Sequence, residues 1–350
     1  MNNNISKTNI ILADCDPGEI KTFTEGCNTV VSDSKFKVLS SISNGSHKGI
    51  IKNFIRYLKY FTFPFLIFLN REKYNVILGW QQFYAINFAL FCRLFHVNKC
   101  NTNVVVNFTY KHKSGIIGKI YYLYMKYCCQ SEYIDYFHVL SYNYIDICSK
   151  ELGINKEKFI VTSFGVPDTY EDMKYLKTPM KDYSLSIGRS NRDFNFLVNV
   201  WKQDCMKGNT LLIVSDTWKP AEQMPPNVIH RTDIGYEDSF AWFNNCSLCI
   251  TPISDGRICS GDTVLLTAMM FGKPVIVTTP STLSEMYVKD GVNGICVEKN
   301  AEKAALIISE ILSDKGRRTE LGTNARKCFL EYFSRKSMGE HLCKKIKELS

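Results

Sequence analysis

The sequence predicts an α/β protein made of two Rossmann-like domains that face each other across a cleft. Its 350 residues suit two domains of ordinary size. The second half alternates short apolar runs with helical segments, which is typical of parallel strands joined by crossover helices. Between the halves, residues 165–183 are polar, contain prolines and offer few apolar side chains to bury, as expected of an interdomain linker.

These patterns place the domain boundaries. The first domain is predicted over 1–170, a linker over 171–182 and the second domain over 183–335. Residues 336–350 are expected to form a carboxyl-terminal helix, and packing back on the first domain is one option for it. In folds of this class the ligand binds at the carboxyl ends of the parallel strands, so the predicted site lies there.

The strands and helices follow from the apolar periodicity. In the first half, strands are predicted at 9–13, 76–78, 103–106, 136–140 and 159–162, with helices at 83–95, 116–129 and 145–152. In the second half, strands are predicted at 185–187, 211–214, 248–253, 275–278 and 294–297. Helices at 193–202 and 237–244 lie between them, together with a helix that opens near residue 262.

Composition excludes several classes of protein. With 45% hydrophobic and 22% charged residues, the chain is neither disordered nor collagen-like. The longest apolar stretch, 61–69, contains Pro64 and is far shorter than the ~20 residues of a spanning helix. No signal-peptide pattern opens the chain, and the 14 cysteines, including the lone Cys246–Cys249 pair, favour reduced core thiols over disulfides or a metal site. We therefore expect a cytoplasmic protein without a bound metal.

Positive charge is concentrated in one segment. Residues 48–130 hold twelve Lys or Arg, a single acid (Glu72) and 20 of the 45 aromatic residues. Four of the cations recur at helical spacing beside an apolar face that includes Phe54, Leu58 and Phe61: Lys48, Lys52, Arg56 and Lys59. Such a helix suits an anionic membrane surface, and an ordinary surface helix is the alternative. Nucleic acid is not an expected partner, because no known nucleic-acid-binding motif is present.

A small-residue loop in the second half predicts an anion site. Ser260, Gly261, Asp262 and Thr263 open a helix that ends at Gly272. Amide groups at a helix amino terminus favour a phosphate, although Asp262 or Ser260 can serve as a simple N-cap. A second element comes from the end of the strand at 185–187, where Gly188 precedes two arginines, Arg189 and Arg192. Guanidinium groups match the oxygens of a diphosphate, and the alternative is a pair of solvated loop arginines.

The run 182–333 resembles the carboxyl domain of GT-B glycosyltransferases of family four, also called glycosyl transferases group 1. The matching pieces are Gly188-Arg189, the block AMMFGKPVI, the block that contains Glu285, Asp290-Gly291 and Asn293-Gly294, and NARKCFLEYFS. Residues 139–168 resemble the end of that family's amino domain more loosely. The resemblance implies transfer of a sugar from a UDP- or GDP-linked donor, with retention and without a metal or further cofactor. It implies diphosphate binding by Arg189, Arg192, Ser260, Gly261, Asp262 and Thr263, and contacts to the nucleoside or sugar by Gly188, Thr267 and Glu285.

The chain departs from the family pattern in one respect. The family commonly carries two glutamates separated by seven residues; the second position is Thr267 here, and the first falls at or near Cys259. Asp255 or Asp262 is the replacement that the loop offers, and backbone contacts to the donor are the alternative. On the acceptor side His112 is the nearest candidate, with a solvated loop histidine as the alternative reading. The predicted catalytic residues are therefore His112 and Asp255, whereas His138 in a buried strand is expected to be structural.

The leading functional hypothesis is a glycosyltransferase that acts on a lipid-linked or membrane-proximal glycan in bacterial surface polysaccharide assembly, such as capsule, O-antigen or exopolysaccharide. It would be peripherally attached to the inner face of the plasma membrane. The missing glutamates motivate a second hypothesis, an inactive GT-B partner protein at the membrane. A sugar-nucleotide epimerase is a third, and it would leave the basic segment unexplained.

Overall fold

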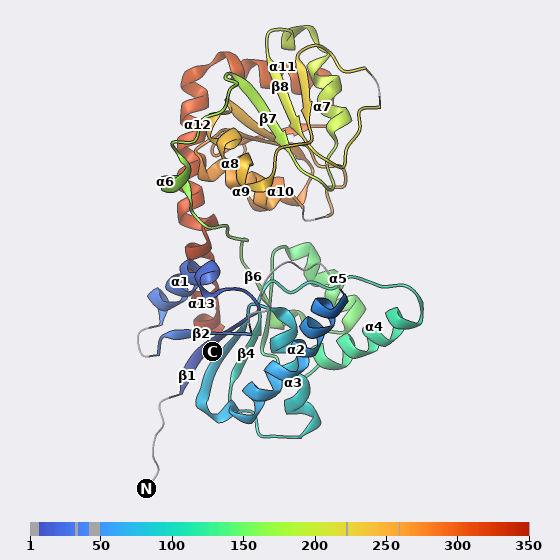
Figure 1. Cartoon of the computed structure of the whole chain (residues 1–350), viewed down its shortest axis with the longest axis vertical. Coiled ribbons are helices and arrows are strands. Elements are labelled where there is room, and N and C mark those ends of the chain that lie inside the picture. The colour runs from blue at the N-terminus through green and yellow to red at the C-terminus, as the bar shows by residue number, and fades with distance from the viewer. Residues whose placement is uncertain (1–6, 32–33, 42–49, 222, 259, 350) are drawn as a thin grey trace. The chain divides into compact units, whose positions relative to one another are not determined.

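The computed structural model describes residues 7–31, 34–41, 50–221, 223–258 and 260–349. The chain divides into two compact units (Figure 1). The first unit comprises Met1–Thr162 together with Arg335–Ser350, and the second comprises Ser163–Ser334. The chain therefore passes from one unit to the other twice.

The first unit is built on a parallel sheet of six strands in the order β2-β1-β3-β4-β5-β6. The strands are β1 (Thr8–Ala13), β2 (Phe36–Ser40), β3 (Tyr74–Gly79), β4 (Thr102–Val105), β5 (Tyr136–Val139) and β6 (Phe159–Val161). The helices are α1 (Lys21–Val30), α2 (Ile50–Leu69), α3 (Gln82–Leu94), α4 (Gly115–Cys129), α5 (Tyr142–Leu152) and α13 (Arg335–Leu349). Short 3₁₀ turns lie at Pro17–Ile20, Arg71–Lys73 and Lys156–Lys158.

The second unit contains a parallel sheet of six strands in the order β12-β11-β10-β7-β8-β9. The strands are β7 (Tyr183–Ile187), β8 (Thr210–Val214), β9 (Val228–Arg231), β10 (Leu248–Thr251), β11 (Val275–Thr279) and β12 (Ile295–Glu298). The helices are α6 (Tyr170–Met173), α7 (Phe194–Trp201), α8 (Tyr236–Asn245), α9 (Asp262–Met270), α10 (Thr282–Met286), α11 (Ala301–Ser313) and α12 (Lys315–Cys328). A 3₁₀ turn lies at Asp204–Met206 and a π-helical turn at Phe329–Phe333.

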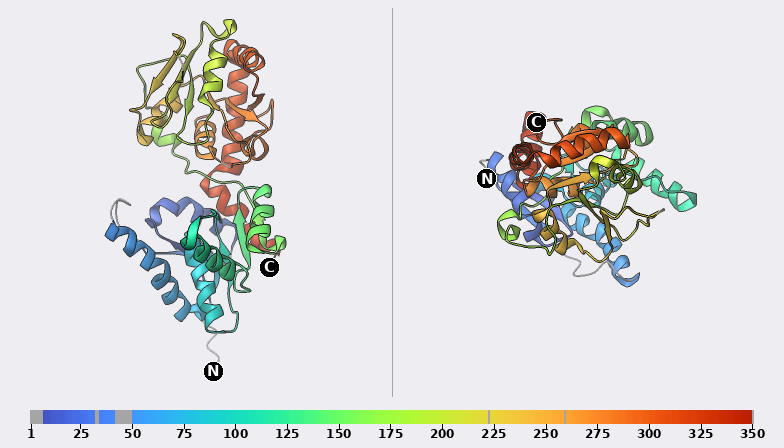
Figure 2. Two further views of the ribbon diagram at one scale, coloured as in Figure 1. Left: turned by 90° about the vertical axis from the view of Figure 1, so that its right-hand side faces the viewer. Right: turned by 90° about the horizontal axis from the view of Figure 1, so that it is seen from above.

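Both faces of the second sheet are buried, as a doubly wound domain requires. Successive residues of β8 show this alternation: Leu211 and Ile213 belong to one apolar cluster, and Leu212 and Val214 to the other. The views in Figure 2 show helices on both sides of each sheet. The predicted fold class, an α/β protein of two Rossmann-like domains, is confirmed.

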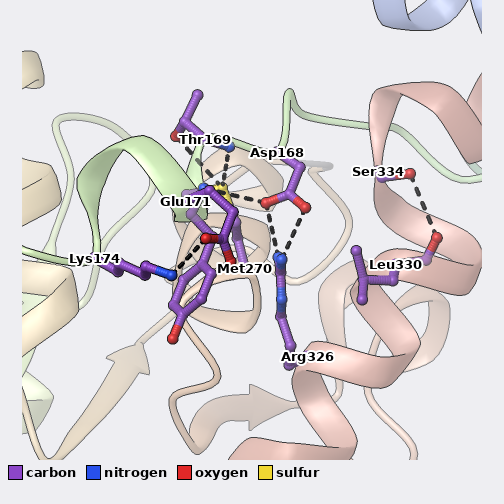
Figure 3. Close-up of polar contacts among 9 residues, drawn as sticks. Asp168, Thr169, Glu171, Lys174, Met270, Arg326, Leu330 and Ser334 are labelled. Atoms are coloured by element: carbon purple, nitrogen blue, oxygen red, sulfur yellow. Dashed lines mark hydrogen bonds and ion pairs between the residues drawn. The ribbon is translucent and has the colours of Figure 1, made fainter.

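The boundary between the units lies earlier in the chain than the predicted linker 171–182. Residues 163–182 belong to the second unit, because Tyr170 and Met173 of α6 pack on its core. Asp168 forms a two-point ion pair with Arg326 of α12, with both N–O distances 2.8 Å (Figure 3). The Thr169 amide donates to the sulfur of Met270 at 3.3 Å. These contacts hold residues 163–182 on the second unit. The polar composition of the segment does not predict them.

The last helix, α13, packs on α1 within the first unit (Figure 1). Its buried side chains are Ser337, Met338, Leu342, Cys343 and Ile346. Two glycines allow the close approach: a Cβ at Gly26 would lie 1.9 Å from the Lys336 carbonyl oxygen, and one at Gly339 would lie 2.3 Å from that of Phe23. Of the options for this segment, the first unit is therefore its partner.

Helix α2 continues through Pro64. A proline cannot donate to the carbonyl four residues earlier, which is that of Tyr60. The buried amide of Asn87 in α3 replaces the missing donor, with an Nδ2–O distance of 2.7 Å to Tyr60. The Tyr124 hydroxyl of α4 donates to Oδ1 of Asn87 at 2.7 Å. These two hydrogen bonds share Asn87 and connect the helices α2, α3 and α4.

No described helix combines the length and the apolar character that crossing a membrane requires. The thirteen cysteines that the structure describes are all unpaired.

His138 of β5 gives the first unit a testable pH dependence. The ring is fully buried; Nδ1 accepts the Asn107 amide at 3.2 Å and Nε2 lies 2.7 Å from the Thr162 hydroxyl. Burial lowers the pKa of His138 to about 4, from an ordinary value of 6.5. Between those pH values the unfolded chain binds the proton and the folded chain does not. The free energy of unfolding of the first unit should therefore fall by up to about 3 kcal/mol when the pH is lowered through this range.

Urea unfolding of the wild type and of His138→Gln at several pH values checks this expectation. The wild type should lose stability below pH 6.5, and the variant, which is less stable at neutral pH, should lose less. Parallel losses in the two proteins would contradict the assignment to His138.

Candidate functional site

A cavity of about 540 Å³ lies at the carboxyl ends of the strands in the second unit. The sheet places β7 beside β10, whereas the chain continues from β7 to β8 on the other side. This is the topological switch point, where doubly wound folds bind their ligands. The polar lining comes from the segments that follow β7, β8, β9 and β10: Gly188, Arg189, Arg192, Ser215, Asp216, Asp233, Ser260, Gly261, Thr263 and Thr267.

Arg192 is the cation that the cavity holds in place. Its guanidinium donates from Nη1 to the Ser190 carbonyl at 3.0 Å and from Nε to the Ile187 carbonyl at 3.4 Å. Among the described residues no carboxylate forms an ion pair with it. Burial lowers the pKa of Arg192, because a half-buried charge loses hydration. The nearby Asp262 carboxylate opposes this lowering without forming an ion pair, so the site contains a partly desolvated positive charge.

Two glycines make room for this guanidinium. A Cβ at Gly188 would lie 2.6 Å from Nε of Arg192, and a Cβ at Gly261 would lie 2.7 Å from Nη2. Gly261 also has a φ of 105°, in the left-handed region that favours glycine. Arg192 therefore lies against the loop that opens α9.

The amino terminus of α9 lies in the same cavity. Gly261 precedes the helix and provides no side-chain cap for its first amide groups. Ser260, Gly261 and Thr263 line the cavity, and Asp262 is not among the lining residues. Burial raises the pKa of the Asp262 carboxyl, although Arg192 and nearby amides oppose this. An anion in the cavity would thus meet both a helix amino terminus and Arg192.

Arg189 occupies the rim and differs from Arg192. It forms a two-point ion pair with Asp216 after β8, with an Nε–Oδ1 distance of 2.8 Å and a second contact from Nη2 to Oδ2. The Arg189 side chain is 75% exposed. Arg189 lowers the pKa of Asp216, so the carboxylate compensates the Arg189 charge.

Part of the second unit matches a known protein family. Residues 182–314 match the family model described as Glycosyl transferases group 1. Over these residues the second unit is similar to that family. No curated protein matches the chain in sequence.

Solved structures resemble the whole chain. HepE from Anabaena in complex with UDP has a TM-score of 0.60 and 13% identity, over 97% of this chain and 100% of that one. Sucrose-phosphate synthase from Thermosynechococcus elongatus has a TM-score of 0.59 and 14% identity, over 98% and 99%. The lipopolysaccharide outer core galactosyltransferase WaaB has a TM-score of 0.56 and 12% identity, over 97% and 100%. These likenesses show a shared fold.

The second unit does not bring every predicted residue to its cavity. Asp255 is not among the lining residues; Arg257 holds it by two contacts of 2.9 and 2.8 Å and lowers its pKa to about 2. Asn191 fixes its backbone, donating to the Asp255 carbonyl at 3.0 Å and accepting its amide at 2.8 Å. Glu285 of α10 is exposed and also lies outside the lining. Cys259, near the first glutamate position, is outside the described residues.

Thr267 and Gly188 do line the cavity of the second unit. The Thr267 hydroxyl donates to the Thr263 carbonyl at 2.7 Å, so it is bound within its own helix where the family has a carboxylate.

Sequence reasoning missed the segment 232–236, which follows β9 and lines the cavity of the second unit. Arg231 holds Asp233 by contacts of 2.6 and 2.5 Å, and Tyr236 begins α8. The available signal was the Asp-Ile-Gly turn before a predicted helix, but the strand in front of it went unrecognised.

His112 belongs to the first unit. It lies in the exposed connection between β4 and α4 and borders an open hollow with Tyr122, Ile147, Lys150 and Glu151.

The four predicted membrane-facing cations lie on or before α2. Lys48 is outside the described residues. Lys52 is exposed, whereas Arg56 and Lys59 are half-buried. Lys59 donates to the Ser41 carbonyl at 3.3 Å, and Arg56 lies over the Tyr60 ring at 5.9 Å. Much of the predicted basic face is therefore turned toward the unit, because the adjoining residues Tyr60, Ile67 and Phe68 form its core.

Proposed function

We propose that the chain transfers a sugar from a nucleotide-diphosphate donor, UDP- or GDP-linked, to a lipid-linked or membrane-proximal glycan acceptor. The observation that carries this proposal is Arg192, a half-buried guanidinium that forms no ion pair among the described residues and lies beside the amino terminus of α9. HepE, which shares the fold, has been crystallised with UDP and with UDP-glucose. WaaB, a galactosyltransferase of the lipopolysaccharide outer core, supports a role in bacterial surface polysaccharide assembly.

The proposed chemistry is stabilisation of a leaving group. The bond between the sugar and the diphosphate breaks, the sugar bonds to an acceptor hydroxyl oxygen, and the hydroxyl proton passes to the departing phosphate or to a base. Negative charge grows on the diphosphate as the bond breaks. Arg192 and the amides of α9 are fixed before the reaction and poorly hydrated, so they stabilise this charge strongly. Arg189 and Ser260 would bind the outer oxygens.

The remaining assignments belong to the same proposal. Gly188 and Thr267 would contact the nucleoside or the sugar, and His112 remains the candidate on the acceptor side. Because Arg192 and a helix terminus supply the positive field, we expect transfer without a metal and, as in the resembled family, with retention of configuration. The protein would work in the cytoplasm, at the inner face of the plasma membrane.

Two assignments change on geometric grounds. Asp255 is held by Arg257 outside the cavity, so a direct role at the donor sugar requires that ion pair to open. Glu285 is exposed outside the same lining. These positions are the specific observations in favour of the second candidate, an inactive partner protein that binds a nucleotide without transferring sugar.

The test combines binding and turnover on the full chain. UDP and GDP are compared for thermal stabilisation, and UDP- and GDP-sugars are then compared for release of nucleoside diphosphate, each with and without EDTA. Stabilisation by one nucleotide and release from its sugar in EDTA support the proposal. Stabilisation without release from any donor or acceptor supports the inactive partner. No stabilisation by either nucleotide contradicts both candidates.

A further inference from the structure

The first unit carries large apolar side chains on the outer side of α4. Ile116, Ile120, Leu123 and Tyr127 are 82%, 63%, 54% and 41% exposed. They follow one another at three or four residues and so fall within about 60° of one helix face. The neighbouring Ile117 is 79% exposed. The opposite side of the helix packs inward through Met125, Cys128 and Cys129.

Helix α2 carries a second set of exposed apolar side chains. Phe54, Leu58 and Phe61 have the same spacing and are 67%, 52% and 45% exposed. The ring of Phe61 lies 6.4 Å from that of Tyr124, centroid to centroid, so the two helices approach each other. We call the combined surface of Phe54, Leu58, Phe61, Ile116, Ile117, Ile120, Leu123 and Tyr127 the apolar face. The Tyr124–Asn87–Tyr60 hydrogen bonds join the helices that carry it.

The apolar face exposes eight large apolar side chains on two neighbouring helices. Soluble monomers rarely expose so many together, so the face indicates contact with a partner. The charges around the apolar face indicate what the partner is. Lys52, Lys113 and Lys119 are exposed beside it, and Lys113 lies 4.1 Å from the Tyr121 ring centroid. Residues 48–130 contain one acid, Glu72. A second copy of the same face would therefore bring lysine against lysine, whereas an anionic surface would pair with them.

We propose that the apolar face inserts into one leaflet of an anionic bilayer, with α2 and α4 lying in the plane of the interface. An interfacial helix of this kind buries its apolar side chains at the acyl boundary and extends lysines to the headgroups. The sequence pattern suggested that cations on α2 make the contact. The structure instead assigns the contact to the apolar residues of α2 and to α4, with lysines at the border.

The placement also fits the position of the acceptor, and in this respect it deepens the proposed function. Helices α2 and α4 follow β2 and β4, so their amino-terminal ends begin at the carboxyl edge of the first sheet. Ile116 is the second residue of α4 and Phe54 the fifth of α2, so both lie near the amino-terminal ends of these helices. A lipid-linked acceptor held at that edge could stay in the leaflet while its glycan reaches the protein.

The experiment measures binding of the full chain to vesicles without any sugar donor. Wild type is sedimented with vesicles of phosphatidylglycerol and phosphatidylcholine, and with phosphatidylcholine alone. Ile116→Glu/Ile120→Glu changes exposed positions near the amino terminus of α4, where acids are compatible with the helix dipole. Phe54→Glu/Leu58→Glu tests α2. The matched control is Leu306→Glu, at a 64% exposed leucine of α11 in the second unit.

We expect wild type to bind anionic vesicles more strongly than neutral ones. Each double variant should reduce the partition coefficient at least about tenfold, and the control should leave it unchanged. Thermal stabilisation by UDP or GDP is recorded for every variant, so that loss of fold, loss of nucleotide binding and loss of vesicle binding are separate results. Unchanged sedimentation of the double variants, or no sedimentation of wild type, overturns the inference. A wild-type dimer that the same substitutions dissociate would overturn it in favour of a second copy.

Discussion

Replacing Arg192 by alanine is expected to lower kcat/KM for sugar transfer at least about 100-fold, a loss of about 3 kcal/mol of transition-state stabilisation. The half-buried guanidinium forms no ion pair among the described residues, so it can pair with a departing diphosphate. Arg192→Lys should not restore the rate. A single ammonium cannot reproduce a planar group that reaches from Gly188 to Gly261. Steady-state assays of nucleoside diphosphate release measure the effect.

The melting temperature distinguishes a catalytic role of Arg192 from a structural one. Because burial disfavours the charged form of Arg192, its removal should leave the melting temperature of the second unit unchanged or raise it. Arg189→Ala is the comparison at the rim of the same site: because that exposed arginine is already paired with Asp216 and would reach only the outer oxygens, it should lower kcat/KM less than about tenfold. A fall in activity that tracks a fall in melting temperature would show that Arg192 is structural. Activity of Arg192→Ala within threefold of wild type would remove the diphosphate assignment.

Gly26→Ala is expected to lower the free energy of unfolding of the first unit by about 2–3 kcal/mol. Alanine normally favours a helix over glycine by about 1 kcal/mol, so the expected sign is opposite to the intrinsic preference. The reason is the crossing of α1 and α13, where a new Cβ would lie 1.9 Å from the Lys336 carbonyl oxygen. A backbone atom cannot rotate away, so the helices must separate. Gly339→Ala meets Phe23 in the same way and should have a similar effect.

Calorimetry or urea unfolding measures this change, and proteolysis within 335–350 reports whether α13 has detached. The control is Gly208→Ala, because no atom lies within 4 Å of a Cβ at that position. It should change the free energy of unfolding by less than about 0.5 kcal/mol. A stabilised Gly26→Ala protein would mean that α13 does not pack on α1 in solution.

Much of the strand pattern could be predicted because buried parallel strands are continuous apolar runs. The prediction at 211–214 coincides with β8 to within one residue, and that at 9–13 with β1. Two strands were missed, β2 and β9. Both lie at an edge of their sheet, and each buries only its first residue fully, so neither shows an apolar run.

Long-range polar contacts explain the other differences. The continuation of α2 through Pro64 depends on Asn87, whose place beside Tyr60 is set by the packing of α3. The meeting of Arg192 with the start of α9 follows from strand ends and was predictable. The distinction between the two arginines was not, since Asp216 reaches Arg189 from a different strand. The capture of Asp255 by Arg257, two residues away, was within reach of sequence reasoning.

The assignment of the last helix to the first unit has a consequence for biosynthesis. During translation the segment that completes the surface of α1 leaves the ribosome only after residues 163–334 of the second unit. The amino-terminal unit must therefore wait, with part of its interior uncovered, until the whole carboxyl-terminal unit has been made. A stop codon placed directly before α13 would therefore damage the unit that was synthesised first.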